Sequence, residues 1–238
     1  MNIAFTAFII TFMVALFIVR RKPRLKWVAL ETPISQAVVN NDIATLRALL
    51  DSGVDPDSIV LVPKFGKGTN TSVDGSPVNS LTALMFAAKH GYECIVESLI
   101  EYGANVNYSN RAGSTALNYA IFGISLEIAT LLLSNNAETN PTGENSEAPL
   151  LLAANAGKIN EVKLLLSFGA DINARGPSNE TGLMLAIEGN HIQLANELIT
   201  SGADVNIVDD KGHTALWEAR RIKNSLLIKL LKDAGASN

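Results

Sequence analysis

The chain has 238 residues, of which 47% are hydrophobic, and its formal net charge at pH 7 is −4. This length and composition allow a sizeable buried core, and the single cysteine excludes a disulfide within the chain. Five of the 19 basic residues lie between positions 20 and 26, so from Trp27 onward 14 basic residues stand against 23 acidic ones, a net charge of −9. This balance argues against nucleic acid as a partner and favours a basic protein.

Residues 1–21 are predicted to form a transmembrane anchor. Every residue from Ile3 to Val19 is apolar except Thr6 and Thr11, and a helix of this length spans about 26 Å, slightly less than the roughly 30 Å hydrocarbon core of a bilayer. The basic cluster follows the apolar run, whereas a secretory signal peptide has the reverse order and a small-residue cleavage site. The alternatives are a cleaved or atypical signal and a helix that docks on the rest of the protein.

Residues 22–31 form a basic juxtamembrane linker in this interpretation. Its charges are attracted to anionic lipid headgroups, and by the positive-inside rule they place the C-terminal side in the cytoplasm, with the N-terminus outside. We therefore expect a single-pass membrane protein. The short single-anchor arrangement favours a bacterial inner membrane.

A pattern with a 33-residue period fills the chain from residue 32 to residue 238. Each copy holds two short helical segments, predicted near 82–89 and 93–101 in one copy, and a helix of this length is marginal alone in water. The copies must therefore stack and bury their apolar faces on one another. The positions that recur at this step are Leu84, Leu117, Leu150, Leu183 and Leu216, with Ala87, Ala120, Ala153, Ala186 and Ala219.

The repeat resembles the ankyrin repeat, which the family writes as TPLH-x-AA, a second helix and GADVN. One copy opens with Thr82-Ala83-Leu84-Met85 and closes with Gly103-Ala104-Asn105-Val106-Asn107. The resemblance implies an all-α ankyrin-repeat solenoid of about six helix-turn-helix repeats with β-turn fingers. We expect Gly103, and Asn136 in the equivalent position, to adopt the left-handed conformation at a helix end.

The chain departs from the family pattern at the histidine of TPLH. In the family this histidine helps to tie neighbouring loops together, so its absence affects the expected hydrogen bonds between loops and leaves the expected fold unchanged. The residues found in this slot are Ser35, Met85, Asn118, Leu151, Met184 and Trp217.

An insertion at 58–79 enlarges the connection after the first repeat. Residues 59–62 are predicted to form a short strand, and residues 64–77 are rich in Gly, Ser, Thr, Asn and Asp, which is typical of a loop. Two interpretations stay open: a contact specific to a partner or to the membrane surface, and a tolerated surface loop.

No motif in the chain indicates catalysis, a cofactor or a metal site. The three histidines fall in different repeats without a partner at metal-ligand spacing, and Asp55, Asp171 and Asp204 recur at the structural period, as turn formers do. Cys94 is expected to be a packed or lightly exposed thiol. We therefore expect no enzymatic activity, no cofactor, no metal and no small-molecule substrate.

The resemblance places partner binding on the first helices and finger tips of the array. Phe122 stands out, because an aromatic residue in a slot that usually faces solvent is either an anchor for a partner or is rotated inward by an irregular third repeat. The candidates on the first helices are Lys89, His90, Phe122, Asn155 and Glu188, with Arg221 in the same slot of the last repeat. Those at the finger tips are Tyr108, Arg111, Glu144, Glu147, Arg175, Glu180, Asp210, Lys211 and His213.

The sequence as a whole predicts a membrane-tethered ankyrin module that docks a protein partner on its concave face, as an adaptor or regulator. An alternative is a bacterial immunity-type protein that neutralises a toxin or effector. An exported ankyrin protein and an enzyme are further alternatives. The last repeat is expected to cap the array through Arg220, Arg221, Lys223, Lys229 and Lys232.

Overall fold

The computed structural model describes residues 25–26, 32–60, 64–65, 80–123, 125–141 and 148–237. The predicted anchor at 1–21, most of the linker at 22–31 and most of the insertion at 58–79 lie outside the described residues. Within them, no helix is both long enough and apolar enough to cross a membrane.

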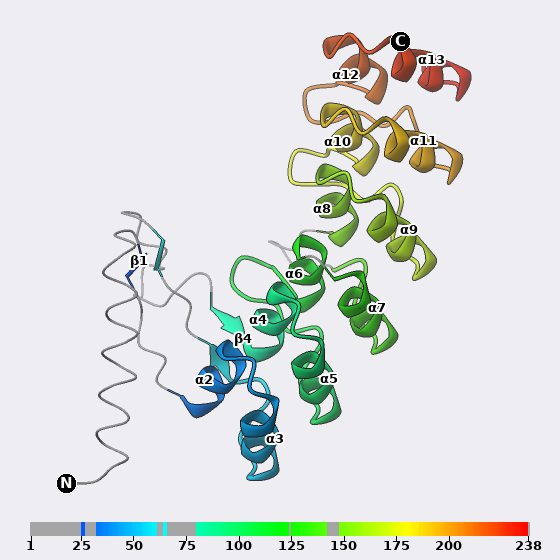
Figure 1. Ribbon diagram of the computed structural model, residues 1–238. Coiled ribbons are helices and arrows are strands. Elements are labelled where there is room, and N and C mark those ends of the chain that lie inside the picture. The colour runs from blue at the N-terminus through cyan, green and yellow to red at the C-terminus, as the bar shows by residue number, and fades with distance from the viewer. Residues whose placement is uncertain are drawn as a thin grey trace, which may run out of the picture.

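The described helices form two parallel stacks, which Figure 1 shows side by side. Consecutive helices pair within each repeat, and helices of the same kind pack against one another between repeats. The inner stack contains α2 (Pro33–Val39), α4 (Ala83–His90), α6 (Ala116–Phe122), α8 (Pro149–Asn155), α10 (Gly182–Glu188) and α12 (Ala215–Arg221). The outer stack contains α3 (Ile43–Asp51), α5 (Glu93–Glu101), α7 (Leu126–Ser134), α9 (Ile159–Ser167), α11 (Ile192–Thr200) and α13 (Ser225–Asp233). The six predicted repeats are therefore confirmed.

Threonine begins most of the inner helices. Its hydroxyl accepts the backbone N–H three residues later, which satisfies one of the N–H groups left unpaired in the first turn. The threonines that cap in this way are Thr32, Thr82, Thr115, Thr181 and Thr214. The fourth repeat has Ala148 in this slot, without a side-chain cap, and Pro149 takes the first helical position. Proline fits there because its missing N–H would be unpaired in any case.

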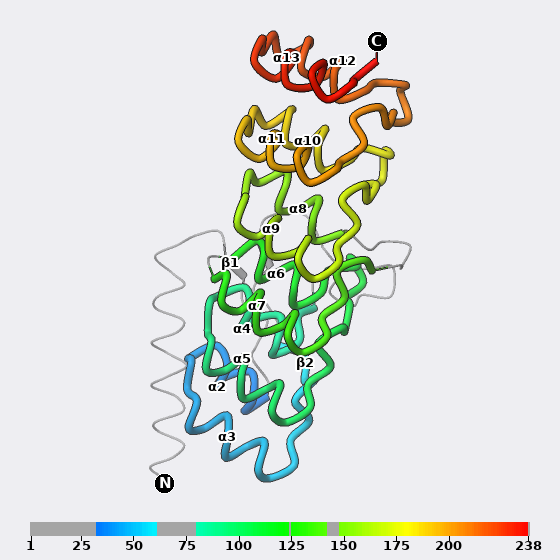
Figure 2. The backbone as a smooth tube through the Cα atoms, turned by 90° about the vertical axis from the view of Figure 1, so that its right-hand side faces the viewer, coloured from blue at the N-terminus to red at the C-terminus, as the bar shows by residue number. Residues whose placement is uncertain are grey.

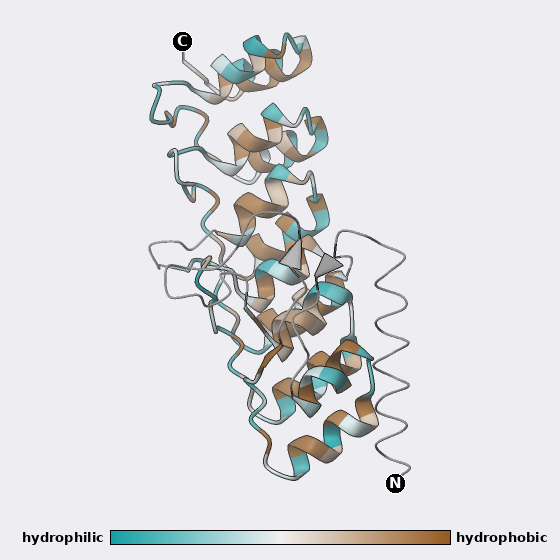
Figure 3. Cartoon of the chain, turned by 90° about the vertical axis from the view of Figure 1, so that its left-hand side faces the viewer, coloured by the Kyte–Doolittle hydropathy of each residue, from teal (hydrophilic) through white to brown (hydrophobic). Residues whose placement is uncertain are grey.

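The apolar positions predicted by the period make one core that runs the length of the array. The recurring leucines and alanines are buried, and the small alanines allow the inner helices to approach closely. Figure 3 shows hydrophobic residues concentrated in the helices and hydrophilic residues in the loops. Each repeat thus completes its core only by contact with its neighbours.

Short strands complete the described structure. β2 (Ile59–Val60) pairs antiparallel with β4 (Leu81–Thr82), which confirms the start of the strand predicted at 59–62. β1 (Leu25–Lys26) pairs antiparallel with β3 (Lys64–Phe65), so the linker contacts the insertion through its backbone.

The chain ends each outer helix with a left-handed residue, as predicted. Gly103 has φ 83° and Asn136 has φ 64°, a conformation that glycine and asparagine tolerate best. Beyond this turn a side chain ties one loop to the next; it is Asp57 in the first repeat and an asparagine in the repeats that follow. Asn140, for example, donates its amide to the carbonyl of Gly169 (2.9 Å) and accepts the N–H of Asp171 (2.8 Å). These bonds connect loops that lack the family histidine.

The last repeat exchanges apolar residues for basic ones where a further repeat would pack. Arg220 is exposed, whereas the equivalent Ile187 and Ile121 are buried. Lys232 is exposed in the slot of Leu133, which is buried. These two exposed basic side chains agree with the polar outer face predicted for this repeat. Arg221 instead belongs to the row of inner-helix residues described below.

Candidate protein-docking surface

One row of exposed side chains runs along the inner helices. Its members are separated by one repeat and lie at or next to the last residue of their helices, and all of them are exposed. The row consists of Lys89, Phe122, Asn155, Glu188 and Arg221. Fingers follow one edge of the same stack in Figure 2. The sequence therefore placed this row on an accessible face.

Phe122 is 63% exposed, so the structure excludes the alternative in which it turns inward. The end of α6 is unusual, because Gly123 follows it with an extended backbone (φ −67°, ψ −161°). In other repeats the residue in the slot after Gly123 has positive φ, as in Gly157 and Asn190. The sequence places the β-branched Ile124 in this slot, and β-branched residues strongly disfavour positive φ. Lys158 donates to the carbonyl of Gly123 (2.6 Å) and so supports the altered helix end.

Lys89 and His90 lie one repeat before Phe122, at the end of α4. The ammonium of Lys89 lies 5.7 Å from the centroid of the Tyr119 ring, within the range of a cation–π contact. The ring of His90 stacks on Phe86, with 4.1 Å between centroids, and its Nδ1 lies 2.9 Å from the carbonyl oxygen of Phe86. His90 is therefore held by its own helix, and both side chains are exposed beside the third repeat.

The predicted finger residues differ in their exposure. Arg111, Arg175, Asp210 and Lys211 are exposed, whereas Glu180 and His213 are partly buried. Tyr108 is partly buried and packs against the core, so it contributes less surface than expected. Glu144 and Glu147 lie outside the described residues.

The two last fingers are hairpin-like and are held by side chains. Arg175 pairs with Thr181, and Val208 with Thr214, through isolated antiparallel bridges. The guanidinium of Arg175 donates to the carbonyl of Val208 in the next finger (3.1 Å). Asn179 donates to the carboxylate of Asp210 (2.5 Å). These contacts fix the spacing between neighbouring fingers, which confirms the predicted β-turn fingers in this part of the array.

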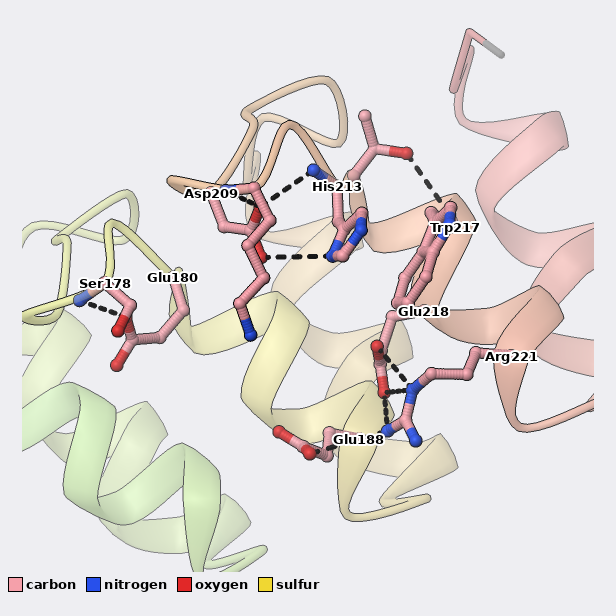
Figure 4. Close-up of polar contacts among 10 residues, drawn as sticks. Ser178, Glu180, Glu188, Asp209, His213, Trp217, Glu218 and Arg221 are labelled. Atoms are coloured by element: carbon pink, nitrogen blue, oxygen red, sulfur yellow. Dashed lines mark hydrogen bonds and ion pairs between the residues drawn. The ribbon is translucent and has the colours of Figure 1, made fainter.

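An aromatic stack lies beside the last finger (Figure 4). The rings of His213 and Trp217 are parallel within 3°, with 3.5 Å between centroids. Asp209 accepts the backbone N–H groups of Lys211 and His213 and lies 3.5 Å from Nδ1 of His213. Burial opposes the ionisation of Asp209, but these N–H groups and the charge of His213 outweigh it and hold its pKa below the ordinary value.

Ion pairs connect the last two inner helices. Arg221 binds Glu218 on its own helix through Nε (2.8 Å) and reaches Glu188 on α10 through Nη2 (3.4 Å). The hydrogen bond and charge of Glu218 raise the pKa of Arg221 above its ordinary value. The side chain of Glu188 remains 61% exposed although its carboxylate pairs with Arg221.

Trp217 departs from the family pattern but is not among the predicted site residues. Its slot is buried in every earlier repeat, from Ser35 to Met184, so the pattern favours burial. The sequence did offer one signal for the exposure of Trp217, which is that a large indole occupies this slot in the last repeat. Asp209 and Glu218 were also missed, since their roles depend on which side chains fold back toward them.

The described residues contain no group of three or more His, Cys, Asp or Glu side chains that could hold a metal ion. Cys94 is exposed on α5, so the expectation of a packed or lightly exposed thiol was wrong. His191 has a structural contact, because its Nε2 lies 3.2 Å from the carbonyl oxygen of Asn155 in the preceding repeat. The surface presents exposed aromatic and charged side chains, which suit contact with another macromolecule.

Comparison with known proteins decides the family. The family described as ankyrin repeats (3 copies) matches residues 34–143, 125–209 and 150–238. The chain belongs to the ankyrin-repeat family. Members of this family are generally protein–protein interaction modules, and the array described here has their architecture.

Individual relatives of this ankyrin-repeat protein are distant and much longer. Rabankyrin-5 of Mus musculus is 35% identical over 106 residues, which cover 44% of this chain and 9% of that protein. Alpha-latrocrustotoxin-Lt1a of Latrodectus tredecimguttatus is 30% identical over 128 residues, which cover 53% of this chain and 8% of the toxin. The chain therefore spans a small part of the curated relatives it matches.

A solved structure supports the fold independently. The ankyrin-repeat domain of human ASB11 superposes with a TM-score of 0.68 at 24% identity, covering 87% of this chain and 85% of that one. At this identity the similarity establishes the architecture, and the partner of the array has to be argued from its own surface.

Proposed function

We propose that this protein is a membrane-tethered binding module that recruits or masks a protein partner on the inner-helix row and the adjoining fingers. The observation that carries the proposal is the exposure of Phe122 within this row. Aromatic residues at accessible, central positions dominate the energetics of many protein interfaces. A preformed rigid surface also loses little conformational entropy when a folded partner docks.

The tether is inferred from the apolar run at 3–19 and the basic residues that follow it. In this proposal the segment spans the membrane once and leaves the array on the cytoplasmic side. Confinement to the membrane surface would raise the encounter rate with partners in the same membrane. Extraction of the full chain by carbonate, or a C-terminal reporter on the external side, would contradict this arrangement.

The chemistry of the partner follows from charge. The chain from Trp27 onward carries a net charge of −9, which favours a basic partner and speeds its approach. A regulator would share its partner with other proteins of the same membrane. A neutraliser of a toxin or effector would instead form a tight one-to-one complex with a basic protein, and this second function rests on the same acidic balance.

Affinity capture of the full-length protein tests the proposal. The C-terminally tagged chain is purified from its own cells in mild detergent, beside a variant that combines Phe122→Ala, Glu188→Ala and Trp217→Ala. These side chains are exposed on the inner helices, so their removal should abolish binding and leave the fold intact.

A matched variant on the outer helices provides the control. It combines Glu97→Ala, Asn196→Ala and Lys229→Ala, at residues that are also exposed, on α5, α11 and α13. A stoichiometric partner that is lost only with the inner-helix variant supports the proposal, and its identity separates a regulator from a neutraliser. A partner retained by the inner-helix variant would reject this surface, and robust turnover by the purified protein would reject a purely binding role.

A further inference from the structure

Acidic side chains are divided unevenly between the two stacks of helices. In the first four repeats, the inner helices α2, α4, α6 and α8 contain no aspartate or glutamate, and neither does the finger at 102–115. The outer helices of the same repeats carry Asp51, Glu93, Glu97, Glu101, Glu127 and Glu161. The net charge of −9 from Trp27 onward therefore does not describe the inner helices of these repeats.

The charged side chains on the inner side of the second and third repeats are basic. Lys89 and His90 end α4, Arg111 belongs to the finger before α6, and all three are exposed. Of the ion pairs among the described residues, none involves Lys89. This part of the docking surface is therefore locally positive, in contrast to the chain as a whole.

The ammonium of Lys89 is held in a defined place by the third repeat. It lies 5.7 Å from the centroid of the Tyr119 ring, and the hydroxyl of Tyr119 accepts a hydrogen bond from the amide of Asn110 (3.2 Å). Asn110 is buried in the finger, where its oxygen accepts the N–H of Ser114 (3.0 Å). Because the ring is fixed in this way, the lysine side chain loses less entropy when a partner pairs with it.

Phe122 lies beside this ammonium on the next inner helix. It follows Tyr119 by three residues, so the two rings share one side of α6. The helices α4 and α6 are neighbours in the inner stack (Figure 1), and packed helices lie about 8–10 Å apart. Seven residues of an α-helix span about 10.5 Å. A helix laid along the row would therefore meet Lys89 and Phe122 with side chains two turns apart.

We propose that Lys89 and Phe122 together bind a helical segment of the protein partner that presents a carboxylate and, seven residues away, an apolar side chain. The carboxylate pairs with the ammonium, and the apolar side chain packs on the exposed phenyl ring. The inference rests on the proposed binding function and names the chemistry at the point of contact.

The acidic balance of the whole chain acts at a different range. Net charge governs the approach of a partner over long distances, whereas pairing at contact depends on the side chains that face one another. A partner that is basic overall can therefore dock through an acidic segment. The sign of the charge that this surface selects separates the two effects.

The test uses the full-length protein in mild detergent and blocked alanine–glutamine helices that carry a fluorophore at one end. One peptide has a glutamate and, seven residues later, a leucine; two others replace the glutamate with glutamine or lysine. Fluorescence anisotropy gives the affinities. We expect the glutamate peptide to bind about twofold to fivefold more tightly than the glutamine peptide, and the lysine peptide to bind least.

Variants then locate the contact. Lys89→Gln should abolish the preference for the glutamate peptide, and Lys89→Glu should reverse the order of the glutamate and lysine peptides. Phe122→Ala should weaken all three peptides by about fivefold or more. The matched control is Lys229→Gln, at an exposed lysine of α13, which should leave every affinity unchanged.

Several results would overturn the inference. They are equal affinity for the glutamate and glutamine peptides, a preference that survives Lys89→Gln, and no binding of the glutamate peptide at millimolar concentration. Tighter binding of the lysine peptide would show that the net charge decides the contact. Self-association of the protein without peptide that Phe122→Ala abolishes, measured by sedimentation, would assign the surface to a second copy of the chain. A different protein captured through Phe122 would still support the binding function if the peptides failed.

Discussion

Removing the side chain of Asn140 should weaken the connection between the third and fourth repeats. The amide of Asn140 donates to the carbonyl of Gly169 at 2.9 Å, and its oxygen accepts the N–H of Asp171 at 2.8 Å. Both partners belong to the turn after α9, so one side chain holds two successive loops in register. Asn140→Ala leaves both backbone groups to water.

The magnitude follows from the number and exposure of these bonds. A typical hydrogen bond contributes about 0.5–1.5 kcal/mol net. Asn140 is exposed, so water replaces part of the loss and the two bonds together should be worth about 1–2 kcal/mol of unfolding free energy. Asn173 accepts one such N–H, from Asp204 at 2.9 Å, and Asn173→Ala should cost about half as much.

Urea unfolding of the full-length protein in mild detergent, followed by circular dichroism, measures both values. The control is Asn196→Ala on the exposed face of α11, where alanine should be neutral or slightly stabilising because it is the better helix former. If Asn140→Ala lowered the unfolding free energy no more than Asn196→Ala does, the loop bonds would not contribute to stability, and the reasoning would be refuted.

Three further predictions concern single positions. Gly169→Ala should lower the unfolding free energy by about 1 kcal/mol or more, since φ is +82°, whereas Asn136→Gly should be near neutral; urea midpoints compare the two. Folding lowers the pKa of Asp209, so its carboxylate stabilises the protein above the ordinary pKa of 3.8, and this stabilisation is lost as the pH falls through the folded-state pKa. The difference in unfolding free energy between the unmodified protein and Asp209→Asn should therefore shrink below pH 3.8, and a constant difference would contradict this. Arg220→Ile exposes an apolar end and should promote self-association, measured by analytical ultracentrifugation.

Much of the array could be predicted because its order is local. The boundaries of α4 and α5 agree with the predicted segments at 82–89 and 93–101 to within a residue or so. The positive φ of Gly103 and Asn136 followed from residue type alone. Each of these features depends on a few neighbouring residues, which the sequence shows directly.

The candidate site was predictable in part. The slots of Lys89 and Glu188 were correctly placed on an accessible face by the resemblance to the ankyrin repeat, which aligns each slot with the same side of its helix. The packing of Tyr108 against the core was not anticipated. The sequence also left both orientations of Phe122 open, since the outcome depends on how the irregular end of α6 is supported by Lys158, a residue of the next repeat.

The 33-residue period by itself determined the helices, their apolar faces and the stacking of the repeats, because short amphipathic helices have no stable alternative to burial on an equivalent neighbour. Only the tertiary structure decided which slots stay accessible. The slot that buries Met184 exposes Trp217, and the imidazole that stacks on the indole comes from the preceding finger. The burial of a side chain depends on the residues that pack around it in space, so the type of the residue alone does not determine it.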